Sequence, residues 1–216
     1  MYALLEYEFN KYCNKAACTA LDAVLLEYEF KEHYWFTQMK VVALSKSPGY
    51  TMIKPVRDSI TLLEGLGVEG DAHMGRTVKH RYLVRKNPEA PNLRQVHLMH
   101  QELFEELKTK GINVNPGEMG ENITTQGIDL LKLPTDTVLH IGKVAQVQIK
   151  GLRDPCKQLD DIQPGLMKAM VSRDDLGKIN FKTGVMGVVL KGGKLFTDDS
   201  IRIEYPQKPF AQLVPV

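Results

Sequence analysis

After residue 39 the chain alternates hydrophobic and polar residues over short stretches, the pattern of half-buried β-strands. In the clearest stretch, residues 144–150, Ala145, Val147 and Ile149 fall on one face and polar residues on the other. The same reasoning predicts strands at residues 41–45, 59–63, 95–99, 137–141, 144–150, 184–191 and 200–205. The run Lys191-Gly192-Gly193-Lys194 predicts a hairpin turn, because glycine tolerates positive φ.

Helical spacing of apolar residues is restricted to two segments after residue 39. Residues 100–110 place Leu103, Phe104 and Leu107 on one face and stop at Gly111, and residues 164–172 form the second segment. Many short strands, few helices and no alternation of strand with helix predict a mainly β (α+β) fold. We expect a barrel-like folded sheet with a few short helices.

Residues 1–38 differ in composition from the rest of the chain. Apolar residues recur at helical spacing from Leu5 to Tyr28, and two of the cysteines, Cys13 and Cys18, lie here. The predicted organisation is a helical extension at 1–38, a domain at 39–206 and a tail at 207–216. The extension is either a helix for dimerisation or a partner, or a segment outside the domain. The strand that opens at Met39 favours the second interpretation.

The bulk composition excludes several classes of protein. The chain has 216 residues, of which 25% are charged and 43% hydrophobic, and its net charge of +2 argues against nucleic-acid binding. Three cysteines make no disulfide scaffold and favour a reducing compartment. No apolar run approaches the ~20 residues of a membrane helix, so we expect no membrane association and a cytoplasmic location.

Cys156 is the strongest candidate for chemistry. It lies in a turn just after the strand at 144–150, beside the rigid Pro155, with Arg153 and Lys157 on either side. Nearby cations stabilise a thiolate, which is the form that attacks electrophiles or binds soft metals.

A glycine-rich run at residues 65–75 is the second candidate. Gly70 and Gly75 permit close approach of a ligand, and Asp71 and His73 are spaced to share a face in extended structure. Such a loop can hold a polar cofactor through main-chain N–H groups. A turn in which Asp71 bonds its own backbone is the commoner explanation, and a single histidine is more often structural than a ligand.

Two further segments have a plain and a functional interpretation. Gly120 and Asn122 suit either an ordinary loop at the start of a strand or a loop that presents Asn122 to a ligand. The basic stretch 76–86 suits either a solvated mobile loop or a rim that binds anions, because guanidinium and ammonium groups pair well with phosphate.

Taken in order, the runs 70–75 (GDAHMG), 120–123 (GENI) and 153–159 (RDPCKQL), with the strand at 184–189, resemble the MOSC domain. This module is named for the C-terminal part of molybdenum cofactor sulfurase, and the resemblance covers about residues 39–206. It implies a mostly β, barrel-like fold with one characteristic cysteine, which Cys156 matches. In relatives such as the amidoxime-reducing component, that cysteine ligates the molybdenum of the pyranopterin cofactor.

The resemblance therefore implies molybdenum cofactor (molybdopterin) with Cys156 as both metal ligand and catalytic residue. Pyridoxal phosphate enters by family-level association only. The basic loop at 76–94 is longer and more charged than a minimal member would need, so the size of the pocket and the substrate stay open. The expected cofactor-binding residues are Gly70, Asp71, His73, Gly75, Gly120, Asn122, Arg153 and Lys157.

Three functions follow as alternatives. The first is an oxidoreductase that reduces N-hydroxylated small molecules with electrons from a separate donor or reductase, since the chain has no flavin or iron–sulfur signature. The second is a carrier or sulfur-transfer module that holds the cofactor, or a persulfide on Cys156, without turnover. The third is a cysteine-nucleophile transferase with His73 or His97 as base, which no local signature supports. Residues 1–38 would be the contact in any homo-oligomer.

Overall fold

The computed structural model describes residues 39–173, 177 and 179–216. The chain divides into two units, 1–38 and Met39–Val216. The helical stripe, Cys13, Cys18 and the partner-helix interpretation all lie outside the described residues. Within the described part of the chain, no helix is long and apolar enough to cross a membrane.

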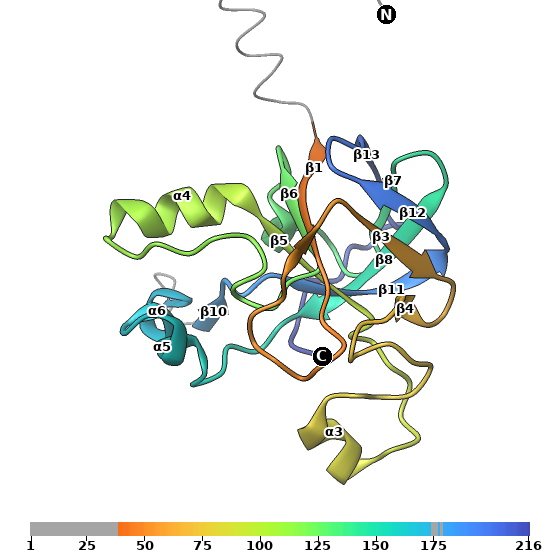
Figure 1. The fold of residues 1–216 in the computed structure, drawn as a ribbon. Coiled ribbons are helices and arrows are strands. Elements are labelled where there is room, and N and C mark those ends of the chain that lie inside the picture. Colours follow the sequence, from red (N-terminus) through yellow and green to blue (C-terminus); the bar gives the residue numbers. More distant parts are fainter. Residues whose placement is uncertain (1–38, 174–176, 178) are drawn as a thin grey trace, which may run out of the picture. The chain divides into compact units, whose positions relative to one another are not determined.

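Strands dominate the described unit, and the helices are few and short (Figure 1). This confirms the predicted mainly β class. The strands are β1 Lys40–Ser45, β2 Val56–Arg57, β3 Ser59–Leu63, β4 Gly67–Val68, β5 Val96–His100, β6 Ile123–Gln126, β7 Val138–Ile141, β8 Ala145–Leu152, β9 Val171–Arg173, β10 Ile179–Phe181, β11 Val185–Lys191, β12 Gly193–Phe196 and β13 Ile201–Glu204. The helices are α3 Arg81–Lys86, α4 Gln101–Thr109, the 3-10 turn η1 Leu130–Lys132, α5 Leu159–Ile162 and α6 Leu166–Ala169.

The largest sheet has eight strands in the order β13-β7-β8-β11-β5-β6-β1-β2. It does not close into a fully hydrogen-bonded barrel, but β1 and the start of β13 meet at one end. The N–H of Val41 donates to the carbonyl of Asp199 at 2.9 Å, and the N–H of Ile201 donates to the carbonyl of Met39 at 2.8 Å. The sheet is therefore barrel-like, joined by a seam between its first strand and its last.

One strand–helix–strand unit contradicts the expectation that there is no such alternation. Strands β5 and β6 pair in parallel, with Leu98 opposite Ile123, and α4 connects them. The sequence indicated that a strand could start after Asn122 but gave neither its bounds nor its parallel pairing, because residues 123–126 do not alternate. The predicted face of α4 is right, because Leu103, Phe104 and Leu107 are all buried.

The predicted hairpin at Gly192-Gly193 is wrong. Strand β12 does not pair with β11 but with β3 in a separate three-stranded sheet, with Leu195 opposite Ile60. The two glycines serve close packing instead. A Cβ on Gly192 would lie 2.7 Å from the carbonyl oxygen of Leu62, so only glycine fits where the chain passes from one sheet to the other.

The helix predicted at 164–172 is shorter in the structure. Helix α6 covers only Leu166–Ala169, and the chain turns at Met170 into β9, which pairs with β10. Leu166 and Met170 are buried in a cluster with the apolar face of α4. Leu166 and Met170 recur at helical spacing because both are buried. The helix ends before Val171, because Val171 pairs with Phe181 in a strand.

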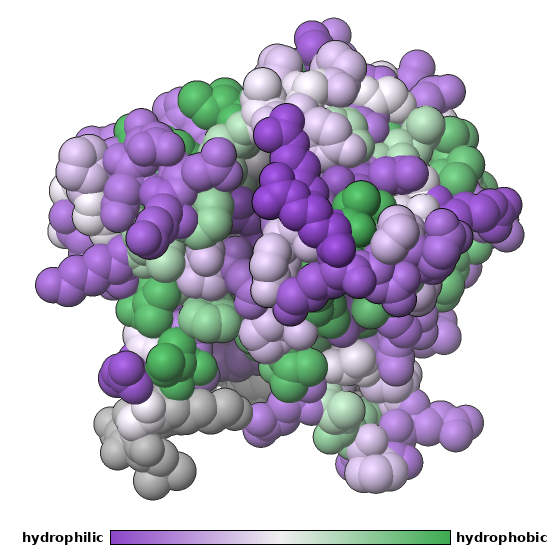
Figure 2. Space-filling view, turned by 90° about the horizontal axis from the view of Figure 1, so that it is seen from below, coloured by the Kyte–Doolittle hydropathy of each residue, from purple (hydrophilic) through white to green (hydrophobic). Residues whose placement is uncertain are grey.

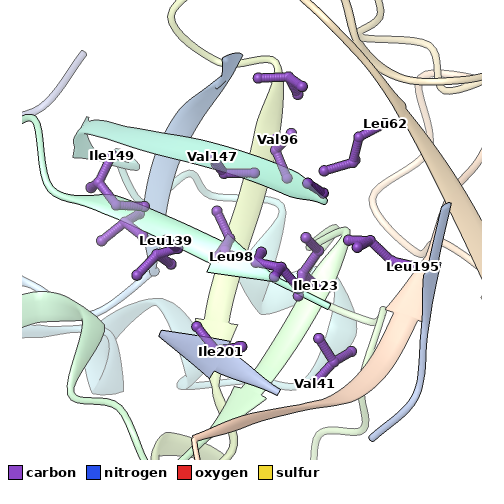
Figure 3. Packing of buried hydrophobic residues seen from close by; sticks show 14 of the residues in the cluster. Val41, Leu62, Val96, Leu98, Ile123, Leu139, Val147, Ile149, Leu195 and Ile201 are labelled. Atoms are coloured by element: carbon purple, nitrogen blue, oxygen red, sulfur yellow. The ribbon is translucent and has the colours of Figure 1, made fainter. Parts of the chain in front are cut away.

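The main core lies between the large sheet and the three-stranded sheet. Fully buried side chains from both sheets and from the seam point toward one another (Figure 3). They include Val41, Leu62, Leu98, Leu139, Val147, Leu195 and Ile201. This core holds the strand ends, from which the loops of the candidate site extend.

Candidate functional site

A cavity of about 420 Å³ brings together the three segments that the sequence singled out. This volume is in the range of sites that bind small molecules. The lining residues are Tyr50, Thr51, Met52, Lys54, His73, His80, Arg81, Tyr82, Arg85, Arg94, His97, Gly120, Asn122, Arg153, Asp154, Cys156, Gln158 and Met186. The predicted residues His73, Gly120, Asn122, Arg153 and Cys156 are among them. Gly70, Asp71, Gly75 and Lys157 are not.

The order of strands in the large sheet explains why these segments meet. Met52 and Lys54 lie in the loop between β1 and β2, Asn122 immediately precedes β6, and Arg153 immediately follows β8. Strands β8, β11, β5, β6 and β1 are consecutive neighbours in the sheet. Loops that are distant in sequence therefore converge at one side of the sheet.

Asp71 lies behind the cavity and holds three of its lining residues. Its side chain is 1% exposed. One carboxylate oxygen, Oδ2, accepts from Lys54 Nζ at 2.8 Å and from Asn122 Nδ2 at 3.0 Å. The other, Oδ1, accepts from the main-chain N–H of His73 at 3.0 Å and lies 3.3 Å from its Nδ1. The predicted turn, in which Asp71 bonds nearby backbone, is therefore present. The same carboxylate also fixes the positions of Lys54, Asn122 and His73 at the cavity.

The protonation states of Lys54 and Asp71 follow from their surroundings. Burial alone would raise the pKa of Asp71, but the hydrogen bonds from His73 and the ammonium of Lys54 lower it well below its ordinary value. Burial lowers the pKa of Lys54, against the opposing pull of Asp71. The 2.8 Å contact and the other donors to the carboxylate favour the ionised pair. Lys54 was missed from the sequence, because a lone lysine between exposed residues gives no signal.

Asn122 and His97 are joined by the parallel pairing of β5 with β6. The N–H of His97 donates to Asn122 Oδ1 at 3.2 Å, and the N–H of Asn122 donates to the carbonyl of His97 at 2.8 Å. His97 Nε2 donates to the carbonyl of Thr183 at 2.7 Å. Burial, with a contribution from Arg153, lowers the pKa of His97 well below its ordinary value, so the ring is neutral at pH 7.

Arg153 has a buried guanidinium nitrogen without a hydrogen-bond partner. Among the described residues nothing bonds its Nη1, while Nη2 lies 3.4 Å from the sulfur of Met52. Burial lowers the pKa of Arg153. An unpaired buried donor of this kind is costly, and a ligand oxygen would satisfy it. The neighbouring Arg94 pairs with Asp154 at 2.9 Å through Nη2, although its Nε also has no partner among the described residues.

Cys156 has a free, half-buried thiol on the cavity. Its Sγ lies 3.7 Å from Gln158 Oε1. Of the two cations that flank it in sequence, Arg153 lines the cavity and Lys157 is exposed and does not.

The basic stretch that the sequence left open contains the short helix α3. Arg81, Tyr82 and Arg85 of this helix line the cavity, as does Tyr50. Tyr50 meets His73 edge to face, with ring centroids 5.3 Å apart. The aromatic and basic rim was visible in the sequence only as a charge run.

The described residues contain no group of three His, Cys, Asp or Glu side chains that could hold a metal ion. A metal that brings its own organic ligands needs only one protein ligand, and a thiol is suited to a soft metal. The donor set of one thiol, one unpaired guanidinium and one buried lysine therefore suits an anionic, metal-bearing cofactor.

Comparison with known proteins identifies the family. The family model described as MOSC domain matches residues 74–202. No match was found among the curated proteins. Among solved structures, the chain is similar to the YuaD protein from Bacillus subtilis, with 24% identity, a TM-score of 0.65, and coverage of 79% of this chain and 97% of that one.

Two further structures share the fold. YiiM from Geobacillus stearothermophilus is 17% identical with a TM-score of 0.56, and the match covers 81% of this chain and 79% of that one. YiiM from Escherichia coli is 18% identical with a TM-score of 0.52, and the match covers 80% of this chain and 73% of that one. At these identities the similarity concerns the fold.

Proposed function

The chain belongs to the MOSC domain family, and from this premise we propose that it is a molybdenum-cofactor-dependent oxidoreductase acting on N-hydroxylated compounds. The observation that carries the proposal is one cavity lined by both Cys156, with its free thiol, and Arg153, whose buried Nη1 has no partner among the described residues. One is the ligand that a soft metal requires, and the other is a partner for a phosphate.

The residues of the cavity fit the cofactor in three ways. Cys156 would ligate molybdenum, and Arg153 and Lys54 would bind the cofactor's phosphate. Gly120 has φ of +80°, and a Cβ there would lie 2.9 Å from the carbonyl oxygen of Met52, so this wall is free of a side chain. The absence of a side chain permits close approach of a flat ring system to the backbone.

When bound, the cofactor would supply a metal centre that accepts oxygen and exchanges electrons. In the net reaction the N–O bond of the substrate breaks, two electrons come from a separate donor and two protons from the medium, and the amine and water leave. The chain's own residues bind and orient the cofactor and the substrate. Asp71 holds His73, Asn122 and Lys54 against the cavity. His97 is neutral, so the positive charge offered to the anionic cofactor comes from Arg153 and Lys54.

The test is the metal content of protein made in a host that synthesises the cofactor. We expect molybdenum in the purified protein, its loss in Cys156→Ala, and reduction of a model hydroxylamine with a chemical electron donor. Arg153→Ala should weaken cofactor retention by about 1.5–3 kcal/mol, the scale of one charged hydrogen bond. Lys157→Ala is the matched control, because this cation is adjacent in sequence but does not line the cavity.

Each outcome separates the alternatives. Molybdenum without turnover supports the carrier function and contradicts the oxidoreductase. Protein that never holds molybdenum, from a host that loads a known molybdenum enzyme in parallel, contradicts both. Equal losses of cofactor in Arg153→Ala and Lys157→Ala would show that the cavity assignment of Arg153 is wrong.

A further inference from the structure

We propose that Arg81 and Arg85 of α3 form a second anion site at the outer part of the cavity, which binds a phosphate carried by the substrate. The substrate class is then an N-hydroxylated base in the form of a nucleoside monophosphate. This inference rests on the proposed function for the reaction, but the anion site itself is argued from the residues of α3 and the cavity.

The two arginines lie on one face of a short helix that buries none of its side chains. Arg81 and Arg85 are four residues apart, the spacing that places side chains together on a helix, and both line the cavity. Like charges at this spacing repel each other. Helix α3 has no buried residue, no acidic residue in its first turn and no side-chain cap. An anion between the two guanidinium groups would relieve the repulsion.

The described residues do not supply that anion. No carboxylate there forms an ion pair with Arg81 or Arg85, whereas Lys54 and Arg94 on the same cavity are both paired. The stretch from Arg76 to Arg94 contains only one acidic residue, Glu89, which does not line the cavity. The outer wall of the cavity therefore carries unneutralised positive charge.

Aromatic side chains lie beside these charges. The guanidinium of Arg81 lies 5.3 Å from the ring centroid of Tyr50, which meets His73 edge to face. Tyr82 lines the same wall and is 56% exposed. Exposed aromatic rings beside arginines are the groups on which nucleobases stack. The combination of ring faces with a phosphate-binding pair selects a base attached to a phosphate.

The position of α3 separates this site from the one assigned to the cofactor. Arg153 and Lys54 come from loops at the sheet, and Lys54 is buried. Figure 1 shows α3 standing apart from the sheets, at the lower end of the molecule. Figure 2 views that end directly, and strongly hydrophilic side chains cross its centre. The inner cations suit the enclosed cofactor and the outer pair suits a group that enters from solvent.

The experiment measures binding of AMP and adenosine to the cofactor-free protein by isothermal titration calorimetry. We expect AMP to bind at least about tenfold more tightly than adenosine, and inorganic phosphate to compete. Arg85→Gln and Arg81→Gln should each weaken AMP binding about tenfold or more, the range of one charged hydrogen bond, with little effect on adenosine. Arg76→Gln is the control, because it makes the same change of charge in the same basic stretch at an exposed position that does not line the cavity.

Equal binding of AMP and adenosine would overturn the inference. Equal losses in Arg85→Gln and Arg76→Gln would also overturn it, because they would indicate general attraction of AMP to a basic surface. In cofactor-loaded protein, Arg85→Gln should raise the KM for an N-hydroxylated nucleotide and leave that for the nucleoside unchanged. If the protein never takes up molybdenum from a competent host but binds AMP in a way that depends on Arg85, the anion site is supported and only the proposed reaction is contradicted. Turnover that shows no preference for the nucleotide over the nucleoside contradicts only the anion site.

Discussion

The buried pair of Lys54 and Asp71 predicts a large and specific loss of stability. Asp71→Ala removes the acceptor of a salt bridge and of hydrogen bonds from His73 and Asn122, and it leaves the ammonium of Lys54 buried at 4% exposure. Removing one partner of a buried pair costs about 3–5 kcal/mol. For a domain of this size the melting temperature should fall by about 6–20 °C.

A substitution of Lys54 separates the effect of an unpaired buried charge from the loss of the other hydrogen bonds to Asp71. In Lys54→Met the carboxylate keeps its donors from His73 and Asn122, so we expect a smaller loss of about 1–3 kcal/mol. The double variant should be more stable than the sum of the single losses predicts, because no uncompensated ammonium remains. Thermal and urea denaturation of all three variants provides the cycle.

Protonation of the Asp71 carboxylate at low pH should also destabilise the protein. Its folded-state pKa lies below the ordinary value of 3.8, so its contribution to stability is present above that pH and is lost as the pH falls below it. Asp71→Asn should reduce this part of the acid sensitivity. An Asp71→Ala protein within about 1 kcal/mol of the original, or single losses that simply add, would refute the assignment of a buried ion pair.

Three further predictions test the fold. A protein beginning at Met39 should be soluble and melt cooperatively; an insoluble or molten product would make the preceding segment part of the core. Gly117 and Gly111 both have positive φ, at +87° and +76°, but only a Cβ at Gly117 would overlap a backbone atom, the carbonyl oxygen of Lys54. Gly111→Ala should cost about 1–2 kcal/mol and Gly117→Ala distinctly more, and equal losses in denaturation would contradict the close contact. His97 is neutral when folded, so the unfolded chain binds more protons below pH 6.5 and stability should fall there by up to about 1.4 kcal/mol per pH unit. His97→Gln should flatten that slope in pH-dependent melting.

Elements with one buried face could be predicted from the sequence with accurate bounds. Residues 59–63 alternate, and β3 spans the same residues, because Ile60 and Leu62 alone face the core. The bounds of strand β6 could not be predicted, since Thr124 and Thr125 are buried beside Ile123 and no alternation remains. The hairpin prediction failed because Gly192 is required for its missing side chain, where the chain packs closely between two sheets, and local sequence does not reveal this.

The candidate site divides in the same way. Cys156 and Asn122 lie in turns with distinctive composition, so they could be picked out before the structure was known. Lys54 and Arg94 are ordinary residues in their local sequence, and only the sheet order brings them to the cavity. Lys157 was chosen because it neighbours the cysteine in sequence, but the turn directs it to solvent. Adjacency along the chain was a poorer guide than the arrangement of strand ends.

The seam between β1 and β13 joins two segments that are synthesised far apart in time. Lys40 bonds Asp198 across a separation of 158 residues, and the backbone of Val41 bonds that of Asp199. The first strand of the domain therefore leaves the ribosome long before its final partner exists. Until β13 is synthesised, one edge of β1 has unpaired backbone groups and is open to pairing with another chain. A ribosome that stalls before codon 198 would release a sheet that cannot close.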